Sequence, residues 1–416
     1  MPDLESRLAA RARGKQPSPI RELLKYLKIE GMISLGGGYP NPKTFVFDSV
    51  DIRFKDGTEA TLAGRELDVA SQYGPSDAHA GLRDEIVAWH KDKDGVELDG
   101  SRLVVLNGCQ EGLFIMAYLF VEADDSIALS EPAYPGALSA FKSFTKNYVA
   151  VPLDGDGMKT DVLEATLAGM SERGEALPKF IYTVPSGHNP GGVALSQERK
   201  RHMLEIASRF DLVILEDDPY QLIRLDDSPP PPTIQSMDTE DRVIRLDSFS
   251  KIFTPGLRIG YASGPAEMVR QFVLFKQSAN LHTSMFIQAV LEKYMSVAGH
   301  DAFRAHIREN CAFYRENRDA MVEAVREFLP EEVGYNIPSE GMFIWFDLPE
   351  CCDARRMIDE RCEELKVLLT PGSAFSTRGG LANSMRASFS MISPAEVREG
   401  IRRFGEMVAA ELGRAG

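Results

Sequence analysis

The sequence contains few cysteines and no long apolar run. Its five cysteines are an odd number without regular spacing, which gives neither a disulfide framework nor the ligand pattern of a zinc site. We therefore expect no metal centre and a reducing, intracellular compartment. The longest apolar run, around residues 113–121, is far too short to cross a bilayer. This pattern argues against a membrane protein.

The N-terminus also lacks an apolar stretch behind its charges, which a secretion signal would need. Residues 1–15 carry arginines and a lysine among alanines, a composition that an organelle presequence shares, but Asp3 and Glu5 weaken that interpretation. We expect a cytoplasmic protein.

An excess of positive charge is missing as well. The 47 basic residues are outnumbered by 62 acidic ones, for a net charge of -15. Binding to nucleic-acid phosphates needs concentrated lysine and arginine, so nucleic acid is not an expected partner. With 44% hydrophobic residues the chain is an ordinary globular protein, and its 416 residues exceed what one hydrophobic core usually serves.

Short β-rich runs alternate with longer helical patterns through the middle of the chain. This alternation predicts crossover units around a mostly parallel sheet, and therefore an α/β fold. In such sheets ligands bind beyond the carboxyl ends of the strands, so we expect chemistry just after each run. The six runs are LVVL at 103, SIALS at 126, FIYTV at 180, LVILED at 212, VIRLDS at 243 and IGYAS at 259.

Beyond Pro265 the pattern changes. It predicts a long amphipathic helix through about residue 328, short strands at GMFIWFDL and SMRASFS with a helix between them, and a closing helix from Pro394.

The most informative segment is SFSKIFTPGLRIGY, which groups Lys251 with phosphate-type donors. A lysine amine attacks a carbonyl well only when it is desolvated or placed near other cations. The hydroxyls of Ser248 and Ser250 and the guanidinium of Arg258 would neutralise and orient a phosphate dianion. Taken alone, the segment would more often be a solvated loop than a cofactor site.

Other motifs favour the functional interpretation, because they follow one order along the chain. The companions of Lys251 are Asn189-Pro190-Gly191-Gly192, Asp217-Asp218-Pro219-Tyr220, Arg258 and Arg386. In this order the chain resembles the class I and II aminotransferases, most of all the branch with α-aminoadipate/kynurenine and aromatic aminotransferases. The resemblance runs from PSPIREL at Pro17 to MRASFS at Met385.

The resemblance implies the aspartate aminotransferase-like fold, in which a large domain with a mostly parallel seven-stranded sheet is joined to a smaller α/β C-terminal domain. We expect an N-terminal arm that covers the substrate over residues 1–48, the large cofactor-binding domain over residues 49–295 and the small domain over residues 296–416. The implied cofactor is pyridoxal 5'-phosphate, bound to Lys251 as a Schiff base.

Three residues are expected to act on the cofactor ring. Asp217 closes the run LVILED, and an anion at this place would keep the pyridine nitrogen protonated. Alone, it could equally be a strand-end aspartate that caps the next helix. The resemblance makes it the ring-nitrogen partner and makes Tyr220 and Asn189 donors to the phenolate oxygen of the ring. The neighbouring His188 is expected to be structural.

The phosphate is expected at Gly108-Cys109-Gln110, because this tripeptide follows a strand and begins an apolar helix. A thiol is a poor phosphate donor, so the backbone amides should carry most of the binding. A catalytic role for Cys109 is not favoured, since no histidine is motif-linked to it. The resemblance further implies that Tyr134 stacks on the ring and that Tyr73 reaches the phosphate of a neighbouring subunit, which predicts a homodimer.

Substrate contacts are expected from the C-terminal part and from the N-terminal arm. The planar fork of Arg386 suits bidentate binding of an α-carboxylate. By resemblance, Arg21 in PSPIREL lies over the substrate side chain, and the segment containing Gly38 and Tyr39 lines the same pocket. An arginine there can pair a distal carboxylate, whereas Tyr39 suits an aromatic ring.

Together these residues predict an aminotransferase that moves an amino group from 2-aminoadipate or an aromatic or large apolar amino acid to a 2-oxo acid such as 2-oxoglutarate, with ping-pong kinetics. A pyridoxal phosphate-dependent lyase or decarboxylase could use the same residues. A transcriptional regulator built on this fold would need a DNA-binding domain before Pro17, where there are only sixteen residues.

Overall fold

The computed structural model describes residues 4–19, 26, 29–33, 35–36, 38–95, 97–226 and 228–415. Arg21 lies outside the described residues. Within them, no helix combines the length and the apolar character that crossing a membrane requires. The chain divides into two compact units, Met1–Phe120 with Leu246–Ala305, and Val121–Arg245 with His306–Gly416. The three-part division expected from the sequence stays a prediction.

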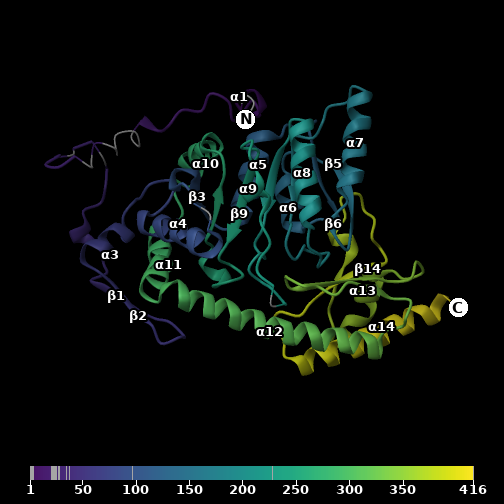
Figure 1. Cartoon of the computed structure of the whole chain (residues 1–416). Helices are drawn as coiled ribbons and strands as arrows, with labels where there is room; N and C mark the ends of the chain where they lie inside the picture. Colours follow the sequence, from purple (N-terminus) through teal and green to yellow (C-terminus); the bar gives the residue numbers. More distant parts are fainter. Residues whose placement is uncertain are drawn as a thin grey trace. The chain divides into compact units, whose positions relative to one another are not determined.

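The largest sheet has eight strands in the order β3-β10-β9-β8-β7-β4-β5-β6 (Figure 1). Its strands are β3 (Leu103–Leu106), β4 (Ser126–Glu131), β5 (Asn147–Asp154), β6 (Gly157–Met158), β7 (Phe180–Thr183), β8 (Val213–Asp217), β9 (Val243–Ser248) and β10 (Gly260–Ser263). All six predicted runs form strands in it. The pairings β4–β5, β4–β7 and β7–β8 are parallel, while β3–β10 and β5–β6 are antiparallel.

The α/β fold is therefore confirmed, with one strand more than the expected seven. The additional strand is β6, whose two residues pair with the end of β5. The edge strand β3 and the interior strands β7 and β8 are buried at every residue. Strands covered on both faces read as continuous apolar runs, which is why the sequence revealed them.

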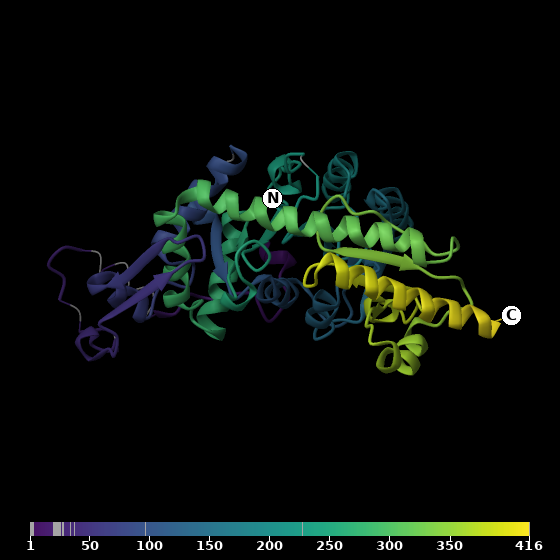
Figure 2. The ribbon, with the colours of Figure 1, turned by 90° about the horizontal axis from the view of Figure 1, so that it is seen from below.

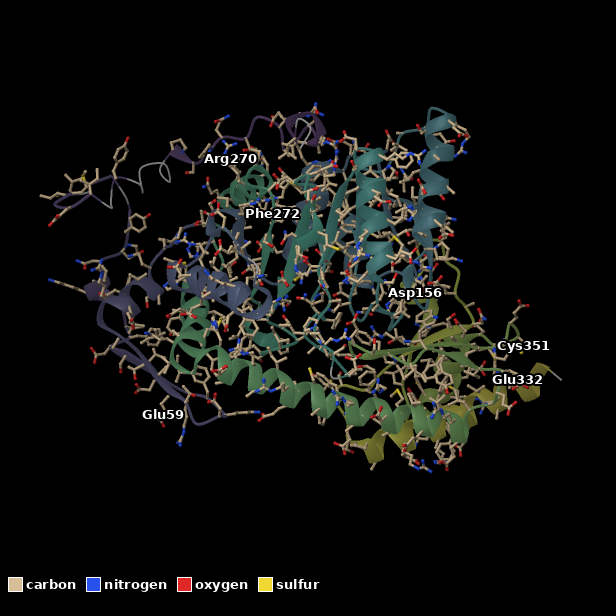
Figure 3. All side chains as sticks on the ribbon, in the orientation of Figure 1. Glu59, Asp156, Arg270, Phe272, Glu332 and Cys351 are labelled. Carbon is tan, nitrogen blue, oxygen red and sulfur yellow. The ribbon has the colours of Figure 1, made fainter. Side chains whose placement is uncertain are left out.

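The first unit has helices around β3 and β10 and a small two-stranded hairpin. Its helices are α1 (Leu4–Arg7), α3 (Gly64–Ser71), α4 (Ala80–Asp94), α5 (Cys109–Phe120), α10 (Ala266–Ala279) and α11 (Met285–Val297). The antiparallel hairpin of β1 (Ser49–Arg53) and β2 (Glu59–Ala63) packs through Leu62 on α3 and α11. On α10, Phe272 is fully buried, and Figure 3 shows its place among the side chains of the unit.

The single long helix expected after Pro265 is wrong, because three helices cover that region: α10, α11 and α12 (Gly299–Phe328). Their apolar periodicity is nearly continuous, so the sequence pattern alone did not separate them. The breaks are local. Leu281 has a φ of 68° between α10 and α11, and Gly299 has a φ of 81° at the start of α12. Left-handed backbone ends a helix.

The second unit contains the rest of the large sheet and a sheet of its own with the order β11-β12-β14-β13. Its strands are β11 (Gly334–Tyr335), β12 (Phe343–Asp347), β13 (Thr370–Pro371) and β14 (Ser384–Ser388), and its helices are α6 (Pro135–Phe141), α7 (Thr160–Glu172), α8 (Gln197–Arg209), α9 (Ile234–Met237), α13 (Ala354–Leu365) and α14 (Pro394–Ala415). The strands, intervening helix and closing helix predicted for the C-terminal part are all present.

The four-stranded sheet is covered by α14 and the C-terminal part of α12, which run side by side in Figure 2. Phe346 of β12 packs in one buried cluster with Val325 of α12 and Phe404 of α14. This cluster holds β12 and β14 in place, and both strands carry site residues described below. All five cysteines are free thiols, and Cys351 lies on the outside of this unit (Figure 3).

Candidate active site

In the first unit, the loop between β3 and α5 has the features of an anion-binding site. Gly108 has a φ of 75°, and a Cβ built there would lie 2.3 Å from the Arg258 guanidinium. Only glycine therefore allows this loop and Arg258 to approach so closely. The helix that begins at Cys109 is twelve residues long, and its first N–H groups favour negative charge.

Arg258 is held by the residues around it. Its Nη2 donates to the Asn107 carbonyl at 3.3 Å, and its Nη1 lies 3.4 Å from the Ser250 hydroxyl. The Ser248 hydroxyl accepts the Ser250 N–H at 3.1 Å. Ser250 thus lies beside the arginine, and Ser248, the last residue of β9, contacts the backbone of Ser250.

The predicted residues at the start of α5 have different environments. The Cys109 thiol donates to the Asp247 carbonyl at 3.3 Å, so its proton is directed at backbone. Gln110 is exposed at the surface of α5. The thiol is thus engaged with backbone, and phosphate binding by the backbone amides stays a prediction.

Sequence reasoning missed the carboxylate that fixes this loop. Glu111 Oε2 accepts the backbone N–H of Asn107 at 2.6 Å and its side-chain amide at 3.1 Å, and it pairs with the buried Lys276 at 3.1 Å. A glutamate in the first turn of a predicted helix was the available signal, because such residues often bond back to the preceding backbone.

Lys251 lies in the turn after β9, partly buried. Its neighbours Phe249 and Ile252 are buried, and the Phe253 N–H donates to the Phe249 carbonyl at 2.9 Å. These contacts fix the backbone that carries the lysine.

Two predicted residues of the first unit, Tyr39 and Tyr73, lie together on its surface. Their ring centroids are 6.3 Å apart in an edge-to-face arrangement, and Tyr73 contacts His282 in the same way at 6.2 Å. Tyr73 is 55% exposed. Gly38, next to Tyr39, is exposed with open space around it.

In the second unit, Asp217 ends β8 and is buried. The Tyr182 hydroxyl of the neighbouring strand β7 donates to its Oδ2 at 2.9 Å. Burial and the negative charge of Asp217 raise the pKa of Tyr182, so this hydroxyl keeps its proton and remains a donor. Sequence reasoning missed Tyr182, because the pairing of β7 with β8 is what brings it to Asp217.

The residues on either side of Asp217 form a separate buried network. Because side chains alternate along a strand, Glu216 and Asp218 leave on the face opposite Asp217. There, Arg245 Nη1 lies 3.1 Å from Glu216 and 2.8 Å from Asp218. One arginine thus compensates two carboxylates on that face. The Asp217 carboxylate lies on the other face, where Tyr182 donates to it.

Arg386, Asn189 and Tyr220 come together around two aromatic rings. The Arg386 Nη1 donates to Asn189 Oδ1 at 2.8 Å, and Tyr220 also hydrogen-bonds the Asn189 side chain. The guanidinium lies 4.4 Å from the ring centroid of Phe343 and 5.0 Å from that of Phe375. Burial raises the pKa of Tyr220, which keeps its hydroxyl protonated at neutral pH.

The surroundings of the Arg386 guanidinium suit the binding of an anionic ligand. Burial lowers its pKa, and its Nε is buried with no hydrogen-bond partner among the described residues. Nη2 has only a long contact of 3.4 Å to the Thr370 hydroxyl. No carboxylate of the described chain forms an ion pair with it.

His188 proves to be structural, but it is buried and fully engaged. Its Nδ1 accepts the Gly191 N–H at 3.1 Å, so Nε2 carries the proton toward the Ser130 hydroxyl at 2.8 Å. Ser130 in turn donates to the Pro132 carbonyl at 2.9 Å. Burial lowers the pKa of His188 to about 3, so it stays neutral. It joins the Asn189 loop to the turn that carries Tyr134.

Tyr134 precedes α6 and is half buried. A Cβ at Gly136 would lie 2.4 Å from the Tyr134 ring, so the glycine makes room for that ring beside the helix. The backbone of Ala133 donates to the Phe375 carbonyl at 2.8 Å. This bond connects the Tyr134 turn to one of the two rings beside Arg386.

Comparison with known proteins agrees with this geometry. Residues 47–404 match the family aminotransferase class I and II. The aromatic-amino-acid aminotransferase 1 of Thermococcus litoralis is 35% identical over 99% of this chain and 96% of its own length. The mitochondrial kynurenine/alpha-aminoadipate aminotransferase of Rattus norvegicus is 31% identical over 96% of this chain and 98% of its own length.

A solved structure extends the similarity to the fold. The kynurenine aminotransferase of Pyrococcus horikoshii, described as a complex with PMP, KYN as substrates and KYA as products, superposes with a TM-score of 0.79 at 34% identity and covers 99% of both chains. The resemblance drawn from the motifs, the aspartate aminotransferase-like fold and the expected cofactor are thereby confirmed. The chain belongs to the class I and II aminotransferases and is a pyridoxal phosphate-dependent transaminase.

Proposed function

We propose that this aminotransferase takes its amino group from 2-aminoadipate, glutamate or an aromatic or large apolar L-amino acid and gives it to a 2-oxo acid such as 2-oxoglutarate, with ping-pong kinetics. The names of the relatives support the donors, since they are aromatic and kynurenine/alpha-aminoadipate aminotransferases. The observation that carries the proposal is the buried Arg386 guanidinium, whose fork suits the carboxylate common to all these donors.

The residues of the first unit fit the phosphate of the cofactor. The close approach of Arg258 to Gly108 and the N-terminus of α5 present a guanidinium and backbone N–H groups together. Ser250 adds a hydroxyl beside the arginine, and the Ser248 hydroxyl holds the backbone of Ser250. We assign these residues, with Cys109 and Gln110 contributing backbone N–H groups, to the phosphate.

The residues of the second unit fit the pyridine ring. The Asp217 carboxylate, oriented by Tyr182, suits a protonated ring nitrogen. Tyr220 and Asn189 would donate to the ring oxygen, and Tyr134 would stack on a ring face. When bound, pyridoxal phosphate supplies the aldehyde that carries the amino group and a ring that accepts electrons from the substrate Cα.

The protein residues then have separate tasks. Arg386 binds the α-carboxylate of the amino acid and orients its Cα. Lys251 holds the cofactor before the reaction, and its released amine takes the Cα proton as a general base and later returns it as a general acid. A lyase or decarboxylase with the same residues is not favoured, because the relatives are named aminotransferases.

Substrate choice provides the test. We expect the purified enzyme to transaminate both dicarboxylic and aromatic amino acids, and Arg21→Ala to lower kcat/KM for 2-aminoadipate far more than for phenylalanine. Loss of a partly desolvated ion pair weakens transition-state binding by about 2 to 4 kcal/mol.

The measurement is a panel of amino acids, each followed by the change in cofactor absorbance and by 2-oxo acid formation. Arg53→Ala, at an exposed arginine paired with Glu59, is the control and should leave the panel unchanged. An equal loss of kcat/KM for every substrate would show that Arg21 does not contact the substrate side chain.

We also propose a homodimer in which Tyr73 of one subunit reaches the phosphate bound by the other. Exposed apolar residues of the same unit support this proposal: Val46 is 89% exposed, Phe47 56% and Tyr73 55%. Large apolar side chains exposed in this way are suited to an association surface. We keep the cytoplasmic location as part of the proposal, in line with the five free cysteines.

Mixed dimers test the shared site. Tyr73→Phe alone should weaken cofactor binding by about tenfold, since one charge-assisted hydrogen bond is lost. A dimer of one Tyr73→Phe subunit and one Lys251→Ala subunit should regain one site with wild-type cofactor affinity and activity. If separately tagged, purified mixed dimers have only weakened sites, Tyr73 acts within its own subunit.

A further inference from the structure

A buried carboxylate in the second unit takes no part in the steps above. Glu340 is 1% exposed and lies directly before Gly341 and β12. Its Oε1 accepts the backbone N–H of Gly187 at 3.2 Å, and its Oε2 pairs with the guanidinium of Arg224. Both contacts come from hydrogen-bond donors, so the site is built for an acceptor.

Three segments of the chain meet at Glu340. The backbone of Leu225 donates to Ser339 at 2.9 Å, and the backbone of Gly341 donates to Ile223 at 2.9 Å. These two bonds tie the segment after Tyr220 to the approach to β12. Gly187 of the third segment lies so close that a Cβ there would be 2.5 Å from the Gly341 Cα.

The third segment is the loop that presents Asn189. At its far end, the Gly192 carbonyl accepts the Asn336 amide at 2.7 Å, and Asn336 Oδ1 accepts the Trp345 N–H at 2.9 Å. Trp345 is the register partner of Arg386 across β12 and β14. The loop is therefore fastened to β12 by neutral bonds at one end and by the Glu340 charge at the other.

We propose that Glu340 is a positioning residue whose ionised carboxylate holds the Asn189 loop against β12 and Arg224, in the geometry that the Asn189–Arg386 pair needs to bind the substrate carboxylate. This inference rests on the proposed role of Arg386. Its consequence is a pH dependence that originates outside the reacting groups.

The charges around Glu340 set its titration. Burial raises the pKa of Glu340 to about 7, the positive charge of Arg224 opposes this, and the negative charge of Asp218 adds to it. Near pH 7 the carboxylate therefore gains a proton, and one of its two oxygens then presents an O–H to a donor. The charged groups that face Glu340 or its partners are Arg224, Asp218, Lys200, Asp226, Arg245 and Arg318.

Stability and function should respond to pH in opposite directions. Because the pKa of Glu340 is raised in the folded protein, the folded state binds more protons than the unfolded state between the ordinary glutamate pKa and about 7. The contribution of Glu340 to stability is therefore full below the ordinary glutamate pKa, and it is lost as pH rises from there to about 7. The contribution to substrate binding appears only above that pH.

The activity test compares two variants at neighbouring positions. Glu340→Gln places an amide donor against Gly187 or Arg224, so kcat/KM at pH 8 should fall about tenfold, chiefly through KM. Wild-type kcat/KM should fall as pH drops below 7. This fall, the acid limb of the pH profile, should be absent in Glu340→Gln. The control Asp226→Asn alters the exposed partner of Arg224 and should keep the wild-type limb.

Two readouts do not depend on turnover. Hydrogen exchange in residues 185–192, corrected for intrinsic rates, should be faster at pH 6 than at pH 8 in the wild type and pH-independent in Glu340→Gln. The denaturant midpoint of the wild type should fall relative to that of Glu340→Gln as pH rises from the ordinary glutamate pKa to about 7, and the difference should level off above 7. If the enzyme turns over no amino acid, the proposed function is wrong. Hydrogen exchange and the denaturant midpoint still test the positioning role of Glu340 in that case.

The inference is wrong if Glu340→Gln keeps the wild-type acid limb and KM, or if exchange in residues 185–192 is the same in both proteins. Should Glu340→Gln not fold, Arg224→Met decides the activity test. Removing that cation should move the acid limb to higher pH. If both variants are unfolded, wild-type exchange in residues 185–192 decides, and equal corrected rates at pH 6 and pH 8 contradict the proposal.

Discussion

Lys251→Ala is expected to fold, to bind pyridoxal phosphate without a covalent bond, and to lose transamination by at least about 10⁴-fold, because one amine serves as covalent anchor and as general acid and base. The fold should survive, since Phe249 and Ile252 hold the turn and Lys251 itself is only partly buried. Cofactor affinity should fall only modestly, because the phosphate contacts remain.

Borohydride treatment of the wild type, followed by peptide mapping, identifies the lysine that carries the cofactor. The exposed Lys142 provides the control, and Lys142→Ala should retain the label and the activity. A label on any lysine other than Lys251 would overturn the assignment. Partial activity of Lys251→Ala in the presence of added methylamine would support the role in proton transfer.

Arg386→Ala is expected to weaken transition-state binding by about 2 to 5 kcal/mol, which lowers kcat/KM by roughly 30- to 5,000-fold for every amino acid substrate alike. The α-carboxylate is common to all of them, so the loss should not depend on the side chain. Arg386→Lys should recover only part of the activity, because an ammonium keeps the charge but not the fork that reaches Asn189 and the carboxylate together.

Steady-state kinetics with 2-aminoadipate and phenylalanine measure this loss, and cofactor titration should show unchanged affinity. Arg378, an exposed arginine before β14, is the matched control, and Arg378→Ala should behave as the wild type. Phenethylamine, which lacks the carboxylate, should react poorly with both proteins to a similar extent. If the reaction of this amine fell as far as that of phenylalanine in Arg386→Ala, the arginine would have another role.

The contrast between Arg386 and Arg21 separates the two carboxylates of a dicarboxylic substrate. Loss of Arg386 should affect all substrates, and loss of Arg21 only those with a distal carboxylate. The Glu340 variants form a third class, in which the loss depends on pH. The three patterns can be distinguished within one panel of substrates and buffers.

The sequence by itself determined the fold class, the family and the candidate site residues. The buried strands are continuous apolar runs, and the polar motifs follow directly after them, as at Asp217 after β8 and Lys251 after β9. These signals are local, since each depends on a few consecutive residues. The exposed hairpin of β1 and β2 and the partly exposed β5 gave no such signal and were missed.

Only the tertiary structure decided which residues support the motif residues. Tyr182 reaches Asp217, Glu111 fixes Asn107 together with Lys276, and Glu340 joins Gly187 to Arg224. Most of these partners lie far apart along the chain and are brought together by strand register and by close glycine contacts. A motif specifies residue types over short spacings, whereas the burial and charge that set a pKa depend on the whole packed surroundings.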